Sequence, residues 1–403
     1  MKDIPAMKPM GSFMKMWQYS SEEKRDLRVD FIRGFVMLIL IVVHIDIFSL
    51  YNFIAWERIG AVTGAEGFVM LSGAILGLLS RKRIYDEGAL GTTISKQFGR
   101  AFLLYRTSLV VILSIALLNI FIDASAAMTF KAYSGKVYNL YPDFALFSQY
   151  QDRIIAKFVM LRYGPHQFQI LGLYVVLLMF SPFILWLLAK KQVLTVLTIS
   201  WLIYLANSGF PVRPTGAQFE YAFPILSWQV LFVHGLVIGF YRNEIWNFFH
   251  SKKGAIAFSI IMVIYLALLF FTYNNPMSGK LPDYMRLHVI DPETFKSIYH
   301  QYFRKNTLGL GRLLNDFAIL FVSYALLSYF WKPINKVFGW FFIPIGQASL
   351  YVFILHVYAC VLIANIVWFQ QGDIWINTLA HSLVFVLMWL MVKYKVAYNI
   401  IPR

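Results

Sequence analysis

Two ionisable side chains in one apolar segment, Arg33 and His44, are the strongest candidates for chemistry. The segment from Phe31 to Leu50 is otherwise mostly Ile, Val, Leu and Phe. Arg33 and His44 are eleven residues apart, almost three α-helical turns, so they point from one helix face about 16 Å apart along the axis. A neutral imidazole can act as a general base or as a nucleophile. The structural alternative is that His44 is a satisfied interhelical hydrogen-bond partner and Arg33 a boundary residue reaching towards water.

Two carboxylates complete the set of candidate catalytic residues. Asp30 precedes Arg33 by about one helical turn and can orient it. Glu66 opens a second apolar segment, whose many small residues predict close packing against another helix. If this helix runs antiparallel to the first, Glu66 lies at a depth similar to that of His44. Charged groups inside a membrane are costly and need a partner or a cavity, so Asp30 and Glu66 join Arg33 and His44 as catalytic candidates.

Long apolar segments must position these residues. Of the 403 residues, 59% are hydrophobic and only 14% charged, compared with about 25% charged in soluble domains. The segments are long enough to cross the ~30 Å hydrocarbon core of a bilayer. The predicted fold class is an all-α, polytopic transmembrane bundle of about ten helices. The spans are expected near 31–50, 60–79, 101–122, 167–189, 192–208, 225–241, 255–273, 308–330, 342–368 and 375–396.

The distribution of basic residues predicts the orientation of the bundle. Lys and Arg gather at alternate segment ends, which places both termini in the cytoplasm by the positive-inside rule. We expect a basic cytoplasmic arm at 1–29, a transmembrane domain at 30–403, and an outward segment at 123–165 that lies partly on the membrane. The net charge of +16 favours anionic lipid or a polyphosphorylated ligand; no nucleic-acid partner is expected. The only cysteine, Cys360, excludes an intramolecular disulfide.

Further polar residues could bind substrates. Arginines at the inner ends of the second and third spans can bind phosphate bidentately, although they can also simply mark topology. In the ninth span, His356 is expected near the midplane like His44, whereas His166 and Arg312 lie near outer helix ends. The two histidines also have structural explanations, His356 as an interhelical residue and His166 as an interfacial one. The candidates are Arg81, Arg83, Arg100 and Arg106 for a cofactor, and His166, Arg312 and His356 for a substrate.

Several collinear motifs between residues 25 and 395 resemble the OpgC family of membrane acyltransferases. The arginine, ten residues, histidine spacing of Arg33 and His44 is similar to a motif of the wider acyltransferase superfamily. The chain departs from the family pattern at Val43 and Gln169, where we would expect acidic residues. The matching segments are 25–34 (RDLRVDFIRG), 65–73 (AEGFVMLSG), 170–178 (ILGLYVVLL), 227–235 (SWQVLFVHG), 305–314 (KNTLGLGRLL) and 345–353 (IGQASLYVF).

The resemblance implies an enzyme that moves an acyl group from cytoplasmic acyl-CoA to a glycan hydroxyl outside the membrane. It implies acetyl-CoA or succinyl-CoA as co-substrate, no metal, and a multi-pass location in the bacterial inner membrane. It also adds Gln229, from the Trp-Gln motif, to the substrate-binding candidates. The expected partners are the lipid bilayer and the glycan acceptor, and a homodimer is left open. The alternatives are a transporter or flippase without acyl-transfer chemistry, and a scaffold subunit of an export complex.

Overall fold

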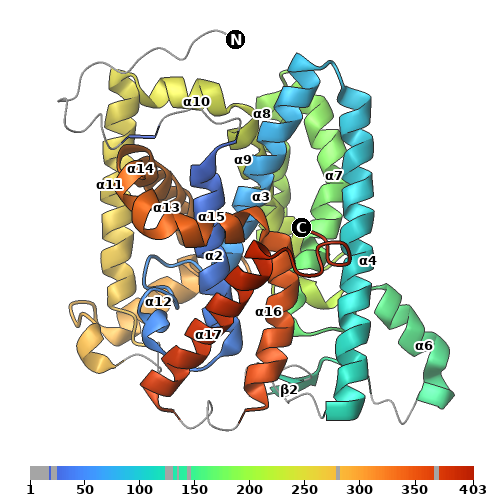
Figure 1. The fold of residues 1–403 in the computed structure, drawn as a ribbon. Coiled ribbons are helices and arrows are strands. Elements are labelled where there is room, and N and C mark those ends of the chain that lie inside the picture. Colours follow the sequence, from blue (N-terminus) through green and yellow to red (C-terminus); the bar gives the residue numbers. More distant parts are fainter. Residues whose placement is uncertain are drawn as a thin grey trace.

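The computed structural model is a bundle of helices, as the apolar segments predict (Figure 1). It describes residues 18–19, 25–122, 130–133, 136–142, 147–277, 282–366 and 372–403. The first half of the bundle contains α2 (Leu27–Ile45), α3 (Gly64–Arg81), α4 (Leu90–Ile122), α6 (Phe147–Val159), α7 (Ile170–Ala189) and α8 (Val193–Gly209). The second half contains α9 (Ile225–Phe240), α10 (Arg242–Phe249), α11 (Lys252–Tyr273), α12 (Pro292–Tyr302), α13 (Leu310–Tyr329), α14 (Trp331–Ile334), α15 (Trp340–Gln347), α16 (Ser349–Ala364) and α17 (Ile374–Lys393).

The all-helical membrane fold is confirmed, but the number of spans is not. Within the described residues, five helices are long and apolar enough to cross a membrane, or up to seven if two bent helix pairs each count as one span. α2 falls outside this group because its 19 residues include Arg28, Asp30 and Arg33, and α8 has only 17 residues. Ten spans and cytoplasmic termini therefore stay predictions.

The ninth predicted span, 342–368, is not one straight helix. The helical stretch Trp331–Gln347 meets Ser349–Ala364 at a bend of 89°, and residues 367–368 lie outside the described part. Pro344 inside α15 removes a backbone donor and weakens the helix there. Gly346 lies against the backbone of Asp30 in α2, and Gly34 of α2 lies against the backbone of Phe342. The absence of both side chains lets α15 cross α2 at backbone contact.

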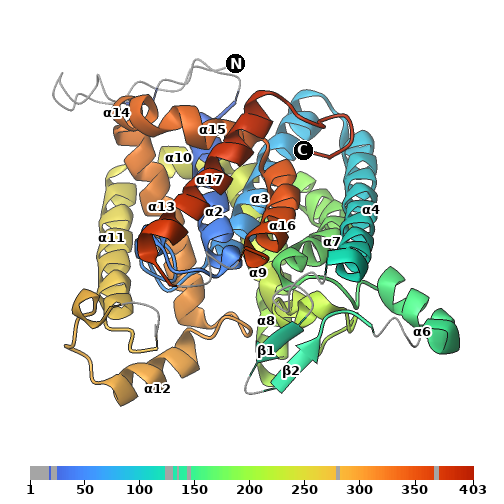
Figure 2. The same cartoon turned by 60° about the horizontal axis from the view of Figure 1, so that its bottom comes forward.

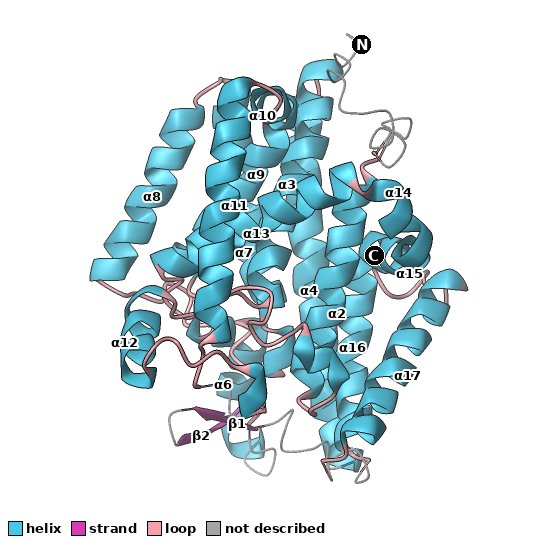
Figure 3. Ribbon diagram, turned by 90° about the vertical axis from the view of Figure 1, so that its left-hand side faces the viewer, coloured by secondary structure: helices cyan, strands magenta, loops and turns pink. Residues whose placement is uncertain are grey.

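The two ends of the bundle differ in structure. At one end, α10 bends away from α9 by 78° and lies across the bundle beside the start of α2 (Figure 1). At the other end lie α12, α6 and a small antiparallel hairpin of β1 (Phe130–Tyr133) and β2 (Lys136–Asn139) (Figure 3). This hairpin is the exception to the all-α prediction among the described residues.

The outward segment predicted at 123–165 contains that hairpin and α6. α6 projects away from the bundle beside α4 (Figure 2). Its apolar residues Phe147, Ile155 and Val159 are exposed, an arrangement suited to the membrane surface. Residues 123–129, 134–135 and 143–146 of the segment are outside the described part.

The described residues include only the last part of the predicted N-terminal arm. Most of residues 1–29 lie outside the described part, but α2 already begins at Leu27. Asp26 is its N-cap, because its carboxylate accepts from the backbone N–H of Arg28 at 3.1 Å. A capping aspartate satisfies a backbone donor that would otherwise have no helical partner. Arg28 and Asp30, which precede the apolar run, therefore belong to the helix.

Helices α3 and α9 pack at backbone distance through glycine. Gly239 of α9 lies against the backbone of Ala74 in α3. A methyl group at Gly239 would overlap that backbone, whereas Gly99 of α4 faces open space. We predict that Gly239→Ala destabilises the protein by about 1–3 kcal/mol, while Gly99→Ala is neutral or stabilises by up to about 1 kcal/mol. Thermal unfolding of both variants in the same detergent measures this, and equal melting temperatures would contradict the packing.

Candidate active site

Two helices bring two histidines into contact in the core of the bundle. His44 lies in the last turn of α2, and His356 lies in the middle of α16. Nδ1 of His44 is 2.8 Å from Nε2 of His356, and the two rings lie at an interplanar angle of 23°. His356 is fully buried. The sequence placed both residues at a similar depth, and the structure makes them direct neighbours.

The hydrogen bonds of this pair define which nitrogens carry protons. Nδ1 of His356 bonds to the carbonyl oxygen of Phe353, and a carbonyl oxygen only accepts. Nδ1 of His356 therefore carries its proton, and with both rings neutral its Nε2 accepts from Nδ1–H of His44. That tautomer places the lone pair of His44 on Nε2. A partner that fixes the tautomer of an imidazole is a usual feature of histidine bases.

The side chain of Arg33 in α2 contacts α16. Its Nη2 donates to Oγ of Ser349, the first residue of α16. Its Nε is buried and makes no hydrogen bond with any residue in the described part. The carboxylate of Asp30 accepts from Arg25 at 2.6 and 2.7 Å. Asp30 thus forms hydrogen bonds to Arg25. Its predicted role of orienting Arg33 would rest on the attraction between their opposite charges.

Glu66 belongs to a buried ion-pair cluster at the other end of the bundle. Nη1 of Arg312 donates to Glu66 at 2.7 Å, and Nη2 donates to Glu57 and to the hydroxyl of Tyr299. The remaining donor, Nε, bonds to the carbonyl oxygen of Phe303 at 2.8 Å. Burial and the nearby Glu57 carboxylate raise the pKa of Tyr299 well above its usual value. Arg312, predicted to bind substrate, is therefore 1% exposed and bonded to the protein itself.

Three members of this region were not singled out from the sequence. Glu57 and Tyr299 lie in segments between spans, where a charged or phenolic side chain is ordinary. Asp316 follows Arg312 by four residues, and this helical spacing could have indicated it. Asp316 is 1% exposed, and its Oδ2 has no hydrogen-bond partner in the described residues.

The arginine candidates for cofactor binding have different surroundings. Arg81 donates to both carboxylate oxygens of Glu244 in α10 at 2.6 Å. Arg83 and Arg100 lie close enough for their like charges to interact, and so do Arg100 and Arg33. Arg106 is exposed on α4. Arg100 therefore lies within electrostatic range of both Arg83 and Arg33.

The two remaining substrate-binding candidates lie elsewhere. Gln229 of α9 accepts from the hydroxyl of Ser200 at 2.7 Å and donates to its carbonyl oxygen, so it joins α8 to α9. His166 begins the helical turn His166–Phe168 that precedes α7. The described residues contain no cluster of His, Cys, Asp or Glu that could hold a metal ion.

A comparison with protein-family models identifies the family of the chain. The model of the family described as OpgC protein matches residues 25–400. The chain belongs to the OpgC family. Membership in the OpgC family, together with the apolar helices, identifies an acyltransferase-type, multi-pass membrane protein. The comparison with curated proteins gives no match.

The buried ion-pair cluster around Arg312 in this OpgC-family chain leads to a prediction about stability. Arg312→Ala would leave Glu57 and Glu66 without their cation in a buried site, and we expect a loss of about 3–5 kcal/mol in unfolding free energy. Lys296→Ala is the control, because its partner Glu293 is exposed and surface pairs contribute at most about 1 kcal/mol. Thermal unfolding in detergent compares the two variants. Equal stability would show that the buried carboxylates do not depend on Arg312.

Proposed function

We propose that this OpgC-family protein transfers an acetyl or succinyl group from cytoplasmic acyl-CoA to a glycan hydroxyl on the outer side of the bacterial inner membrane. The observation that carries the proposal is the hydrogen-bonded pair of His44 and His356. His44 lies on the same helix as Arg33, and its partner His356 is fully buried in the bundle. An imidazole with a defined tautomer in that position can move a proton between two substrates that approach from opposite sides.

In the proposed step, His44 acts as the general base. Its Nε2 takes the proton of the acceptor hydroxyl while the hydroxyl oxygen attacks the thioester carbonyl and forms the C–O bond. The resulting tetrahedral intermediate collapses, the C–S bond breaks, and the coenzyme A thiolate leaves. That thiolate receives the proton from Nε2 of His44, so the products are an ester and a free thiol. His356 is a positioning residue, since it accepts from Nδ1–H of the reacting ring.

Donor binding is assigned to the positive charges near the end of the bundle where α10 lies. Coenzyme A carries several phosphates, and arginine binds phosphate through two parallel hydrogen bonds. Arg100 and Arg83, with Arg106, are proposed to bind these phosphates. The buried Nε of Arg33 supplies a further donor along the path to His44. Arg81, which is paired with Glu244, is proposed to orient α10 rather than to contact the donor directly.

The test of the proposed function is acyl transfer by the purified full-length protein in detergent. Acetyl-CoA and succinyl-CoA are supplied with a panel of soluble oligosaccharides, and both thiol release and the mass of the acceptor are measured. Detergent removes the two compartments that transport requires, so a transporter or flippase gives no product. We expect an acylated oligosaccharide and stoichiometric free thiol. Absence of both, from protein with a cooperative melting transition, would overturn the proposal.

The role of the histidine pair has its own prediction. We expect His44→Ala to lower kcat by at least about a hundredfold, in the range of general-base contributions. His356→Ala should cause a smaller loss and shift the pH profile of kcat/KM, while His356→Gln retains more activity because its side-chain oxygen can accept from Nδ1–H of His44. His300→Ala, at an exposed position of α12, is the control. Full activity of His44→Ala would exclude His44 as the base.

The donor site gives a separate prediction. Arg100→Gln should raise the KM for acyl-CoA about tenfold with a small change in kcat, because a charge-assisted hydrogen bond to phosphate is lost from ground state and transition state alike. The control is Arg153→Gln on the exposed surface of α6. Steady-state kinetics with varied acyl-CoA measures both. An unchanged KM for Arg100→Gln would place the phosphates elsewhere.

A further inference from the structure

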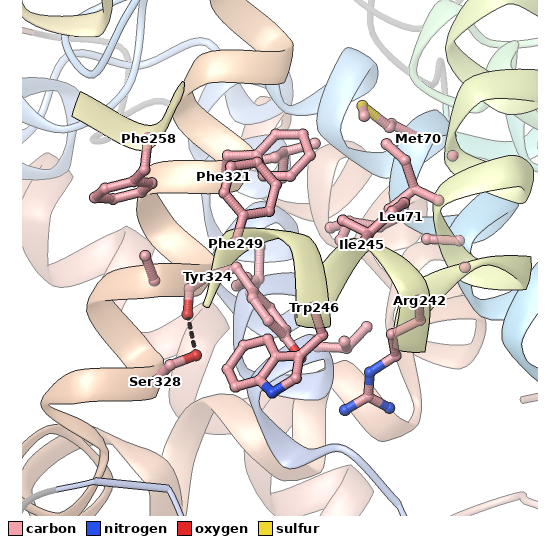
Figure 4. Close-up of a pocket in the computed structure, with 18 of the residues that line it drawn as sticks. Met70, Leu71, Arg242, Ile245, Trp246, Phe249, Phe258, Phe321, Tyr324 and Ser328 are labelled. Atoms are coloured by element: carbon pink, nitrogen blue, oxygen red, sulfur yellow. Dashed lines mark hydrogen bonds between the residues drawn. The ribbon is translucent and has the colours of Figure 1, made fainter. Parts of the chain in front are cut away.

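A cavity of about 390 Å³ lies beneath α10, apart from the histidine pair. Its walls come from α2, α3, α9, α11 and α13, and its surface is mostly apolar (Figure 4). Phe249 from α10, Phe258 from α11 and Phe321 from α13 gather at one side, and Leu71 of α3 lies opposite. The volume is within the ~300–1,000 Å³ range of ligand sites. The cavity can therefore hold an elongated apolar group.

The position of α11 exposes this cavity to the bilayer. α11 is a candidate membrane span, yet only Gly254, Phe271 and Thr272 of its residues are buried. It is attached to the bundle through α10 and α13, so the cavity lies between a peripheral helix and the main body. Bilayer lipid is the apolar molecule that reaches such a position directly. The short acetyl and succinyl groups proposed as donors have no need of an apolar space of this size.

One end of the cavity is polar and carries excess positive charge. The carboxylate of Asp26 accepts from Arg28 at 2.9 Å, from Arg242 at 2.6 Å and from the hydroxyl of Tyr324 at 2.7 Å. Burial would raise the pKa of Asp26, but the hydrogen bonds and charges of the two arginines lower it below its usual value. The carboxyl thus stays ionised and neutralises one guanidinium of two.

Of these two cations, only Arg242 is accessible. Arg28 is 4% exposed and lies over the ring of Tyr324 at 4.3 Å, while its Nη1 donates to Ser328 at 2.7 Å. The side chain of Arg242 is 35% exposed and lines the cavity. Exposed Lys252 and Lys253 begin α11 just after α10 ends. An anionic group beside an apolar chain matches this combination of charge and cavity.

We propose that the cavity binds an acyl chain of an anionic phospholipid, with its phosphate at Arg242. The chain enters between α10 and α11 and fills the space lined by Phe249, Phe258 and Phe321. This site is independent of the proposed acyl transfer. It does not include His44, His356, Arg33 or Arg100.

Lipid binding is tested with the delipidated full-length protein in detergent. Phosphatidylglycerol and phosphatidylcholine with identical chains are titrated, and bound lipid is counted by native mass spectrometry while thermal unfolding is followed in parallel. We expect phosphatidylglycerol to bind more tightly and to raise the melting temperature by mass action. Equal binding of the two lipids would overturn the assignment of the headgroup. Displacement of phosphatidylglycerol by coenzyme A alone would show that the cavity is a nucleotide site instead.

Variants separate the headgroup from the chain. Arg242→Gln should weaken phosphatidylglycerol binding about five- to tenfold, whereas Arg242→Lys keeps the charge and most of the preference. Ala325→Phe, which fills the cavity from α13, should weaken the binding of both lipids by at least about tenfold. Val263→Phe is the matched control, because Val263 is 66% exposed on α11 and does not line the cavity. Equal lipid affinity of Ala325→Phe and Val263→Phe would exclude the cavity as the chain site.

Discussion

The backbone contact between α2 and α15 is the constraint on which the candidate active site depends. Gly34 and Gly346 permit this contact, since a side chain at either position would overlap the backbone of the other helix. The crossing ends α15 at a fixed place, and α16 begins two residues later with Ser349. Ser349 therefore meets Arg33, and about two turns further, roughly 10 Å along the axis, His356 meets His44. Two hydrogen bonds thus join α2 and α16 as parallel neighbours.

The buried charges divide between two ends of the bundle and serve different purposes. Around Arg312, the carboxylates of Glu57 and Glu66 satisfy a cation that would otherwise be very costly to bury. That cluster joins α3, α13 and the segment before α3. All three guanidinium nitrogens of Arg312 already donate hydrogen bonds within the protein. Around Arg33, by contrast, a buried donor has no partner in the described residues. An unsatisfied buried donor costs free energy, which is why we associate this end with a ligand.

The end of the bundle beside α10 combines two kinds of positive site. On the side of α2 and α4, Arg83 and Arg100 are proposed to bind the phosphates of acyl-CoA, and Arg33 to supply a further donor. Arg242 places charge at an apolar cavity beside the peripheral helix α11. The two proposed ligands follow from what surrounds the arginines. Arginines without an apolar cavity beside them suit the phosphates of a nucleotide, whereas an arginine beside a large apolar cavity suits an anionic lipid. In both proposals, part of the excess of basic residues binds a ligand in addition to marking topology.

Hydropathy and charge in the sequence by themselves determined the helical membrane class and the approximate helix positions, and they singled out Arg33 and His44 as candidates, because both signals are local. The OpgC resemblance of the sequence was confirmed over residues 25–400. Tertiary structure decided the partners: that His356 contacts His44, that Glu66 pairs with Arg312, and that Asp30 bonds to Arg25. These contacts depend on how helices distant in sequence rotate and cross. Such crossings are set by glycine contacts and by the 89° bend at Ala348, which no local pattern of apolar residues encodes.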